Sequence, residues 1–170
     1  MDLKALAQQH IEAENVHSAE KTLETVASGG AYYKVYSTGQ SFTARDKIFD
    51  FYSDIMKAVP DMFVQVEHMI EDQAQRQVFV QYKFSGTHKG NLDGLAPTNR
   101  KFSYNGAILY EFDENGKLTK EIQYFDKTEL LSALGIIKDT TTQLGKFLLM
   151  FPQSPFYTLR CAWWQLTNKK

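Results

Sequence analysis

Apolar residues recur at helical spacing over residues 2–28. The stripe along the first half of this stretch is formed by Leu3, Leu6, His10 and Ile11. Asp2 is a residue type that caps helix N-termini, and Ser18 is placed to restart the helix after a kink near Asn15. Gly29 and Gly30 follow the stretch, and glycine commonly ends helices. We therefore expect a kinked N-terminal helix that ends before Gly29.

A second stretch of helical spacing runs from Thr43 to Pro60. Its wide apolar face consists of Ile48, Phe51, Tyr52, Ile55, Met56 and Val59. Thr43 and Asp46 have the spacing of a capping box, which predicts a helix start at Thr43. Pro60 predicts the end of the helix. Between the two helical stretches, Tyr32 to Tyr36 is a short strand candidate, and residues 37–41 are expected to form a loop.

The middle of the chain alternates between apolar and polar residues, as strands do. In the run 62–70, one face is predicted to carry Met62, Val64, Val66, His68 and Ile70. In the run 78–88, one face is predicted to carry Val78, Val80, Tyr82, Phe84, Gly86 and His88. Two further strands, 102–112 and 118–125, flank Asn115-Gly116, a strong hairpin signal. In the last strand, Ile122 and Tyr124 share their parity with Asp126.

Helices that precede consecutive strands indicate an α+β fold, with the helices packed on one face of the sheet. A short helix is expected over 127–134, after which the chain changes character. Residues 138–170 carry five basic residues and one acidic residue, with many aromatic side chains between them. We expect two short helices here, at about 140–150 and 155–167. We interpret 1–137 as the domain and 138–170 as a C-terminal extension that is not a domain of its own.

Composition narrows the possible functions. The 170 residues carry a formal charge of −1, which gives no global attraction to nucleic acid. A single cysteine, Cys161, excludes an internal disulfide and fits a reducing compartment. The N-terminus lacks the apolar run of a signal peptide, so we expect a cytoplasmic protein. No Gly-rich phosphate loop and no zinc-type spacing of histidines is found, so we expect no cofactor and no metal.

The stretch 86–135 carries a set of motifs in a fixed order. Gly86-Thr87-His88-Lys89-Gly90 is followed by Pro97-Thr98-Asn99-Arg100, then by the hairpin, and then by an Asp that leads into a helix ending in Leu134-Gly135. This order resembles the SnoaL-like polyketide (ester) cyclases of the NTF2-like superfamily, with Asn99 in place of the usual Gly. The resemblance implies a cone, in which N-terminal helices pack on a strongly curved antiparallel or mixed sheet. It also implies a homodimer and a pocket for a small apolar carbonyl compound.

Asp126 has two interpretations. The resemblance places the family's general acid/base Asp at this position, and a carboxyl at an apolar pocket wall would have a raised pKa suited to proton transfer. The spacing of Asp126 and Glu129 before Leu130 equally predicts an N-cap of the helix 127–134. A carboxylate that accepts backbone N–H bonds has a lowered pKa and is a weaker base, so the two roles differ in their consequences.

The resemblance also places His88 near the pocket, where it would stabilise an enolate oxygen, although a His at a strand end is commonly structural. Arg100 is a candidate for binding a substrate carboxylate or ester, with surface ion pairing as the alternative. The remaining candidates for the pocket wall are Tyr52, His68, Tyr82, Phe84, Tyr104, Ile122 and Tyr124.

The function implied by this resemblance is cofactor-independent acid/base catalysis, an aldol-type cyclisation or isomerisation of a carbonyl or ester compound. Asp126 and His88 would be its catalytic pair. The alternative is a non-catalytic NTF2-like module that binds a ligand or a protein. A third hypothesis gives residues 138–170 a docking role at a partner or a membrane surface.

Overall fold

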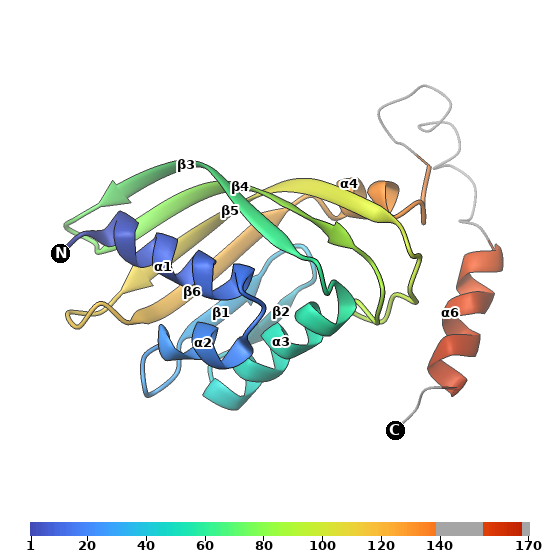
Figure 1. Cartoon of the computed structure of the whole chain (residues 1–170), viewed down its shortest axis with the longest axis horizontal. Helices are drawn as coiled ribbons and strands as arrows, with labels where there is room; N and C mark the ends of the chain where they lie inside the picture. The colour runs from blue at the N-terminus through green and yellow to red at the C-terminus, as the bar shows by residue number, and fades with distance from the viewer. Residues whose placement is uncertain (139–154, 168–170) are drawn as a thin grey trace.

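The computed structural model describes residues 1–138 and 155–167. Figure 1 shows a long, curved sheet with the helices α1, α2 and α3 gathered on one of its faces. The six strands follow the order β2-β1-β6-β5-β4-β3. Helices on one face of a curved mixed sheet make the cone that the resemblance implied, and the expected α+β class is confirmed.

The kinked N-terminal helix is two helices, α1 (Leu3–Asn15) and α2 (Ala19–Glu24). The Asp2 carboxylate accepts a hydrogen bond from the Ala5 backbone N–H at 3.0 Å, and the Ser18 hydroxyl accepts one from Lys21 at 3.2 Å. Both predicted caps are therefore confirmed, because each satisfies a backbone donor that a helix start leaves free.

Helix α3 (Arg45–Ala58) begins later than expected. Its N-cap is Ala44, which has no side chain that can accept a hydrogen bond, so the capping box predicted at Thr43 is wrong. Arg45 fixes this helix start instead. Its guanidinium donates to the carbonyl oxygens of Leu23, Val26 and Ala27 at 2.8–3.1 Å. These bonds tie the start of α3 to the end of α2.

The sheet is mixed. Its strands are β1 (Tyr32–Val35), β2 (Gln40–Phe42), β3 (Phe63–Asp72), β4 (Gln77–Thr87), β5 (Lys101–Phe112) and β6 (Leu118–Phe125). All neighbours are antiparallel except β1 and β6, which are parallel. Strand β2 lies partly within the stretch that was expected to be a loop. The hairpin between β5 and β6 turns at Gly116, whose φ of +75° is the conformation that glycine adopts readily.

A β-bulge reverses the faces of β3. The register with β4 shifts between Val66 and His68, so that Val66 pairs with Tyr82 while His68 pairs with the exposed Gln81. An extra residue in one strand inverts the alternation of every residue beyond it. His68 is consequently exposed, and Ile70 is 67% exposed. The prediction that both continue the inner face is wrong.

A second irregularity does the same in β6. The register with β5 shifts between Glu111 and Phe112, whose partners are Lys120 and Leu118. Leu118 is fully buried, but beyond the shift Glu121 faces inward and Tyr124 is 43% exposed. The predicted inner face of β6 is therefore wrong, and the residues of opposite parity point into the cone.

Helix α4 (Lys127–Ala133) and helix α6 (Pro155–Thr167) confirm two of the predicted C-terminal helices. The helix predicted over 140–150 lies outside the described residues. Arg160 of α6 donates to the carbonyl oxygen of Pro97 at 2.6 Å, while Leu159, Trp163 and Leu166 are exposed. No helix within 1–138 or 155–167 has the length and apolar character needed to cross a bilayer. Dimerisation and docking through the extension stay predictions.

Candidate functional site

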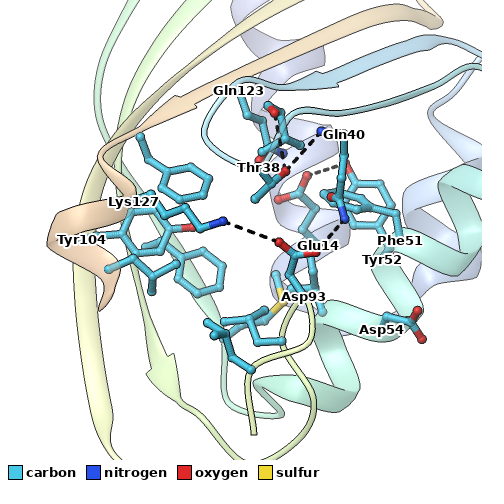
Figure 2. A pocket seen from close by; sticks show the side chains of 18 of the residues that line it. Glu14, Thr38, Gln40, Phe51, Tyr52, Asp54, Asp93, Tyr104, Gln123 and Lys127 are labelled. Carbon is cyan, nitrogen blue, oxygen red and sulfur yellow. Dashed lines mark hydrogen bonds and ion pairs between the residues drawn. The ribbon is translucent and has the colours of Figure 1, made fainter. Parts of the chain in front are cut away.

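A cavity of about 830 Å³ opens between the sheet and helix α3. Its wall on the sheet side is aromatic and consists of Tyr82, Phe84, Phe102, Tyr104 and Phe125. The rings of Phe84 and Tyr104 stack with centroids 5.2 Å apart. Phe51 and Tyr52 of α3 close the opposite side, as Figure 2 shows. Such a cavity suits a compound with a flat apolar part, because aromatic rings line both of these sides.

The floor of the cavity is different, because it is polar and buried. Glu14 of α1, Tyr52 of α3 and Gln123 of β6 all line the cavity at this end. Glu14 is only 4% exposed, and Tyr52 is 2% exposed. Behind them lie His10 and Glu121, both fully buried. Five polar side chains from α1, α3 and β6 therefore gather at this end of the cavity.

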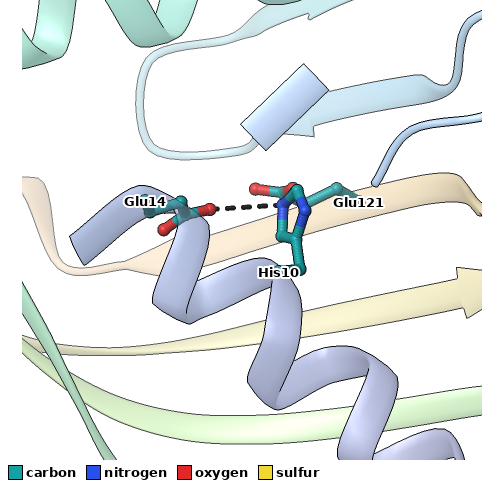
Figure 3. Close-up of side chains that lie close together, drawn as sticks. All are labelled: His10, Glu14 and Glu121. Atoms are coloured by element: carbon teal, nitrogen blue, oxygen red, sulfur yellow. Dashed lines mark hydrogen bonds and ion pairs between the residues drawn. The ribbon is translucent and has the colours of Figure 1, made fainter. Parts of the chain in front are cut away.

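Short distances connect the members of this cluster. Nε2 of His10 lies 3.2 Å from Oε2 of Glu121 and 3.3 Å from Oε1 of Glu14 (Figure 3). The hydroxyl of Tyr52 lies 2.9 Å from Oε1 of Glu14, 3.0 Å from Oε2 of Glu121 and 3.1 Å from Nε2 of His10. We refer to His10, Glu14, Tyr52 and Glu121 as the floor cluster.

The other side of the His10 ring fixes its protonation. The Thr25 hydroxyl donates to the carbonyl oxygen of Thr22 at 2.6 Å, so it accepts from Nδ1–H of His10, 2.5 Å away. Nδ1 therefore carries a proton, and Nε2 faces the carboxylates. The Tyr110 ring packs edge-on against the imidazole, with centroids 5.4 Å apart. Charge on the ring is thus shielded from water and compensated only within the floor cluster.

Burial and the attraction between His10 and the two carboxyl groups have opposite effects on the pKa values of His10 and Glu14. Burial alone lowers the pKa of His10, but the hydrogen bonds and charges of Glu121 and Glu14 outweigh it and raise the pKa to about 9. Burial raises the pKa of Glu14; His10 offsets part of this, and the nearby charge of Glu121 raises it further. One imidazolium neutralises one carboxylate, and a second buried negative charge is unfavourable. The Glu14 carboxyl, with its raised pKa, therefore holds a proton at a less acidic pH than an exposed glutamate would.

This arrangement supports proton transfer to a bound molecule. Glu14 is the member that combines a carboxyl group with access to the cavity. A carboxyl with a raised pKa both accepts and returns a proton in the useful range. Tyr52 lines the same cavity, and its hydroxyl shares its single proton with the carboxylates of Glu14 and Glu121. A carbonyl compound seated on the floor would thus meet the Glu14 carboxyl beside the Tyr52 hydroxyl.

Among the described residues, three members of the floor cluster also form a group of possible metal ligands. His10, Glu14 and Glu121 each offer one ligand atom, and these atoms lie within 4.8 Å of one another. The internal hydrogen bonds already pair these atoms with protons. We therefore interpret the floor cluster as a proton-bearing site.

Asp126 lies outside the cavity. Its carboxylate accepts from the backbone N–H of Thr128 at 2.7 Å and caps α4, which confirms the helix-cap interpretation. Asp126 itself is exposed, although its neighbours Phe125 and Lys127 line the cavity. The inverted alternation of β6 is the cause, because it turns the parity of Asp126 away from the cone. A catalytic role for Asp126 stays a prediction.

His88 is fully buried but also lies outside the cavity lining. Its Nδ1 accepts from the backbone N–H of Thr98 at 3.3 Å, and the two residues thereby hold the loop after β4 in place. Burial lowers the pKa of His88, and the backbone carbonyls of Gly90 and Leu95 offset only part of this lowering. A neutral ring that fastens a loop is the structural role that its position at a strand end suggested.

The remaining sequence candidates divide into two groups. The cavity is lined by Tyr52, Tyr82, Phe84 and Tyr104. Four others do not line it: His68, Arg100, Ile122 and Tyr124. The Arg100 guanidinium packs over Gly135, where an added Cβ would lie 2.5 Å from its Cζ atom. The exposed ring of Tyr124 stacks on that of Tyr36, with centroids 4.9 Å apart.

Sequence reasoning missed Glu14 and Glu121. Glu14 follows His10 by four residues on the packing stripe of α1, so a buried His–Glu pair was a readable signal. Glu121 gave no such signal, because simple alternation along β6 places it on the outer face. Only the register shift in the hairpin turns its carboxylate toward His10.

The α+β fold of this chain is the NTF2-like fold, which is also described as ketosteroid isomerase-like. Residues 4–134 match the family of SnoaL-like polyketide cyclases, and the chain belongs to that family. The match ends just before the C-terminal extension. Comparison with curated proteins finds no match.

Several solved structures share the fold. AclR from Streptomyces galilaeus, a candidate hydroxylase, is 17% identical and superposes with a TM-score of 0.70 over 99% of this chain and 98% of its own. A candidate SnoaL-like polyketide cyclase from Shewanella putrefaciens CN-32 is 15% identical, with a TM-score of 0.69 over 79% of this chain and 86% of its own. SalBIII, an epoxide hydrolase/cyclase-like enzyme of pyran ring formation in salinomycin, is 13% identical, with a TM-score of 0.64 over 75% and 92%. At these identities the similarity establishes the fold, and function rests on the site.

Proposed function

We propose that this chain is an enzyme that binds a small apolar carbonyl or ester compound and catalyses an aldol-type ring closure or a related isomerisation. The observation that carries the proposal is the buried Glu14 carboxyl at the end of an aromatic cavity, beside the hydroxyl of Tyr52. Family membership supports the reaction class, because SnoaL-like polyketide cyclases are named for it.

The chemistry follows from the geometry of the floor. The Glu14 carboxylate removes a proton from the carbon next to the carbonyl group. The single hydroxyl proton of Tyr52, which lies between the carboxylates in the resting site, then turns from the newly protonated Glu14 to the enolate oxygen that forms. The enolate carbon attacks a second carbonyl of the same molecule, and Glu14 returns its proton to the new alkoxide. His10 and Glu121 do not reach the cavity, so they act as positioning residues. They hold Glu14 and Tyr52 in place and keep the charge of the cluster balanced.

The first step is measurable without knowledge of the natural substrate. Deuterium exchange at the carbon next to the carbonyl of α-tetralone, an aromatic ketone of suitable size, is followed by NMR in heavy water. We expect wild-type protein to accelerate the exchange and Glu14→Gln to lose at least about a hundredfold of that acceleration, the scale of acid/base catalysis. Glu12→Gln, an exposed change on the same helix, is the matched control and leaves the exchange unchanged.

Asp126→Asn decides between the two assignments of the acid/base. Exchange that persists in Asp126→Asn and is lost in Glu14→Gln supports the floor cluster. The reverse pattern supports Asp126 and overturns our assignment.

A non-catalytic ligand carrier is the second candidate. It is favoured by the floor cluster itself, whose members already bond to one another and so form a stable interior without a substrate. Tight retention of an aromatic compound with no exchange above the rate in buffer would establish the carrier and refute the enzyme.

A further inference from the structure

Asp93 lies at the mouth of the cavity, between donors from opposite sides. Its Oδ1 accepts from the side-chain amide of Gln40 in β2 at 3.1 Å. Its Oδ2 lies 4.0 Å from Nζ of Lys127, at the start of α4. Figure 2 shows Lys127 and Gln40 directed at Asp93 from two sides. The protein thus holds one of its own carboxylates between an ammonium and an amide, at the open end of an aromatic cavity.

The turn that carries Asp93 has a defined shape. Leu92 and Leu95 exchange backbone hydrogen bonds of 3.2 and 2.9 Å, and both side chains line the cavity. Asp93 itself has φ +50°, a left-handed conformation that Asp tolerates better than most residues. This turn presents the Asp93 carboxylate at its tip, directly over the mouth.

The contact between Asp93 and Lys127 is nevertheless weak. A separation of 4.0 Å is too long for a direct hydrogen bond, and the side chains are 41% and 45% exposed. Half-exposed ion pairs of this kind contribute little to stability. The other lysines that line the cavity, Lys47 and Lys57, have closer partners at 3.1 and 3.6 Å. Among these three lining lysines, Lys127 therefore has the most distant carboxylate partner and the least exposed side chain, so an incoming anion meets an ammonium without a close hydrogen-bonded partner.

We propose that the cavity takes an aromatic compound with an anionic group, and that Lys127 and Gln40 bind this group at the mouth in place of the Asp93 carboxylate. The orientation follows from charge. Lys127 offers a cation at the mouth, whereas the charges of His10, Glu14 and Glu121 offset one another at the floor, so the anionic end stays at the mouth and the neutral carbonyl end enters first. This proposal names the substrate class of the proposed function. It rests on that function in one respect, namely that the reaction takes place at the floor of the cavity.

Two fluorescent probes with the same aromatic frame test the proposal by binding alone. Anilinonaphthalene sulfonate carries an anionic group, and N-phenylnaphthylamine does not. We expect both to bind, each displacing the other. Lys127→Gln should weaken the sulfonate by about fivefold, the scale of one half-exposed ion pair. Asp93→Asn should strengthen it by a similar factor, because it removes the competing carboxylate.

The neutral probe should bind all variants equally, which also shows that the cavity is intact. Lys83→Gln, an exposed change on β4 outside the cavity lining, is the control for net charge and should leave both probes unaffected. The proposal is overturned if Lys127→Gln weakens both probes alike, if neither probe responds to it, or if the wild type binds neither. Because no turnover is measured, failure here is distinct from a failure of Glu14→Gln in the exchange experiment.

Discussion

Nε2 of His10 and Oε2 of Glu121 lie 3.2 Å apart although 111 positions separate the two residues. Neither side chain has any exposed surface. A pair of this kind is held by its own attraction and by the hydrogen bonds around it, since water contributes nothing. Removing His10 would leave two buried carboxyl groups without a cation, which is far more costly than the pair itself is stabilising. Stability and proton affinity of this protein should therefore depend on the same few residues.

Stability should fall as the pH rises from neutral to alkaline. The folded-state pKa of His10 is raised to about 9 from an ordinary value of 6.5. The contribution of His10 is therefore fully present below pH 6.5 and is lost as the pH rises through 9. The raised pKa of Glu14 acts in the same direction at lower pH. We expect a loss on the order of 2–3 kcal/mol of unfolding free energy across this range.

Urea unfolding at pH 6 and at pH 9.5 measures this loss. His68→Gln, a change on the exposed face, is the control and should keep the dependence. His10→Gln should remove most of it. An unchanged unfolding free energy of the wild type across the range would contradict the predicted pairing.

Glu121→Gln should show how much the negative charge of Glu121, as distinct from its volume, contributes to the floor cluster. Gln has nearly the same volume, but it leaves the His10 imidazolium with one fewer carboxylate. We expect the pKa of His10 to fall below 9 and the unfolding free energy at pH 7 to fall by about 2 kcal/mol. This is less than for a buried charge left without any partner, because Glu14 still lies 3.3 Å from His10.

NMR titration of the His10 ring and urea unfolding measure the two effects. Glu67→Gln on the exposed face of β3 is the matched control. A His10 pKa that stays at the wild-type value in Glu121→Gln would show that Glu14 alone sets it.

Asp126→Ala should cost about 1 kcal/mol, the usual value of an N-cap, because the Thr128 backbone N–H loses its acceptor. Asp126→Asn should cost only a few tenths, because Asn caps helices almost as well as Asp. The pair therefore distinguishes a cap from an acid/base, for which the two variants would be equally damaging to the exchange of α-tetralone. Thermal unfolding of both variants provides the stability comparison.

Local sequence determined the beginnings and ends of most elements. Asp2, Ser18 and Asp126 each accept a backbone N–H two or three residues ahead, so each cap needs nothing from the rest of the chain. The turn at Gly116 is equally local. Thr43 shows the limit, because Arg45 donates to the carbonyl groups of Leu23 at the end of α2 and of Val26 and Ala27 just after it. These bonds fix the start of α3 without a capping side chain.

Tertiary structure decided the site. Two register shifts, before His68 and at the start of β6, reverse which residues face the cone. A prediction from alternation assumes that no extra residue interrupts the strand. It therefore placed His68, Ile122 and Tyr124 on the inner face and Glu121 on the outer face. The neighbouring strand and the curvature of the sheet accommodate the inserted residue. Both depend on residues far away in the sequence, so the local pattern does not reveal the insertion. The sequence therefore determined the α+β class, and its alternation placed Tyr82, Phe84 and Tyr104 on the wall of the cavity. Only the folded pairing of β5 with β6 turned Phe125 to the cavity, brought Glu121 to His10 and formed the floor.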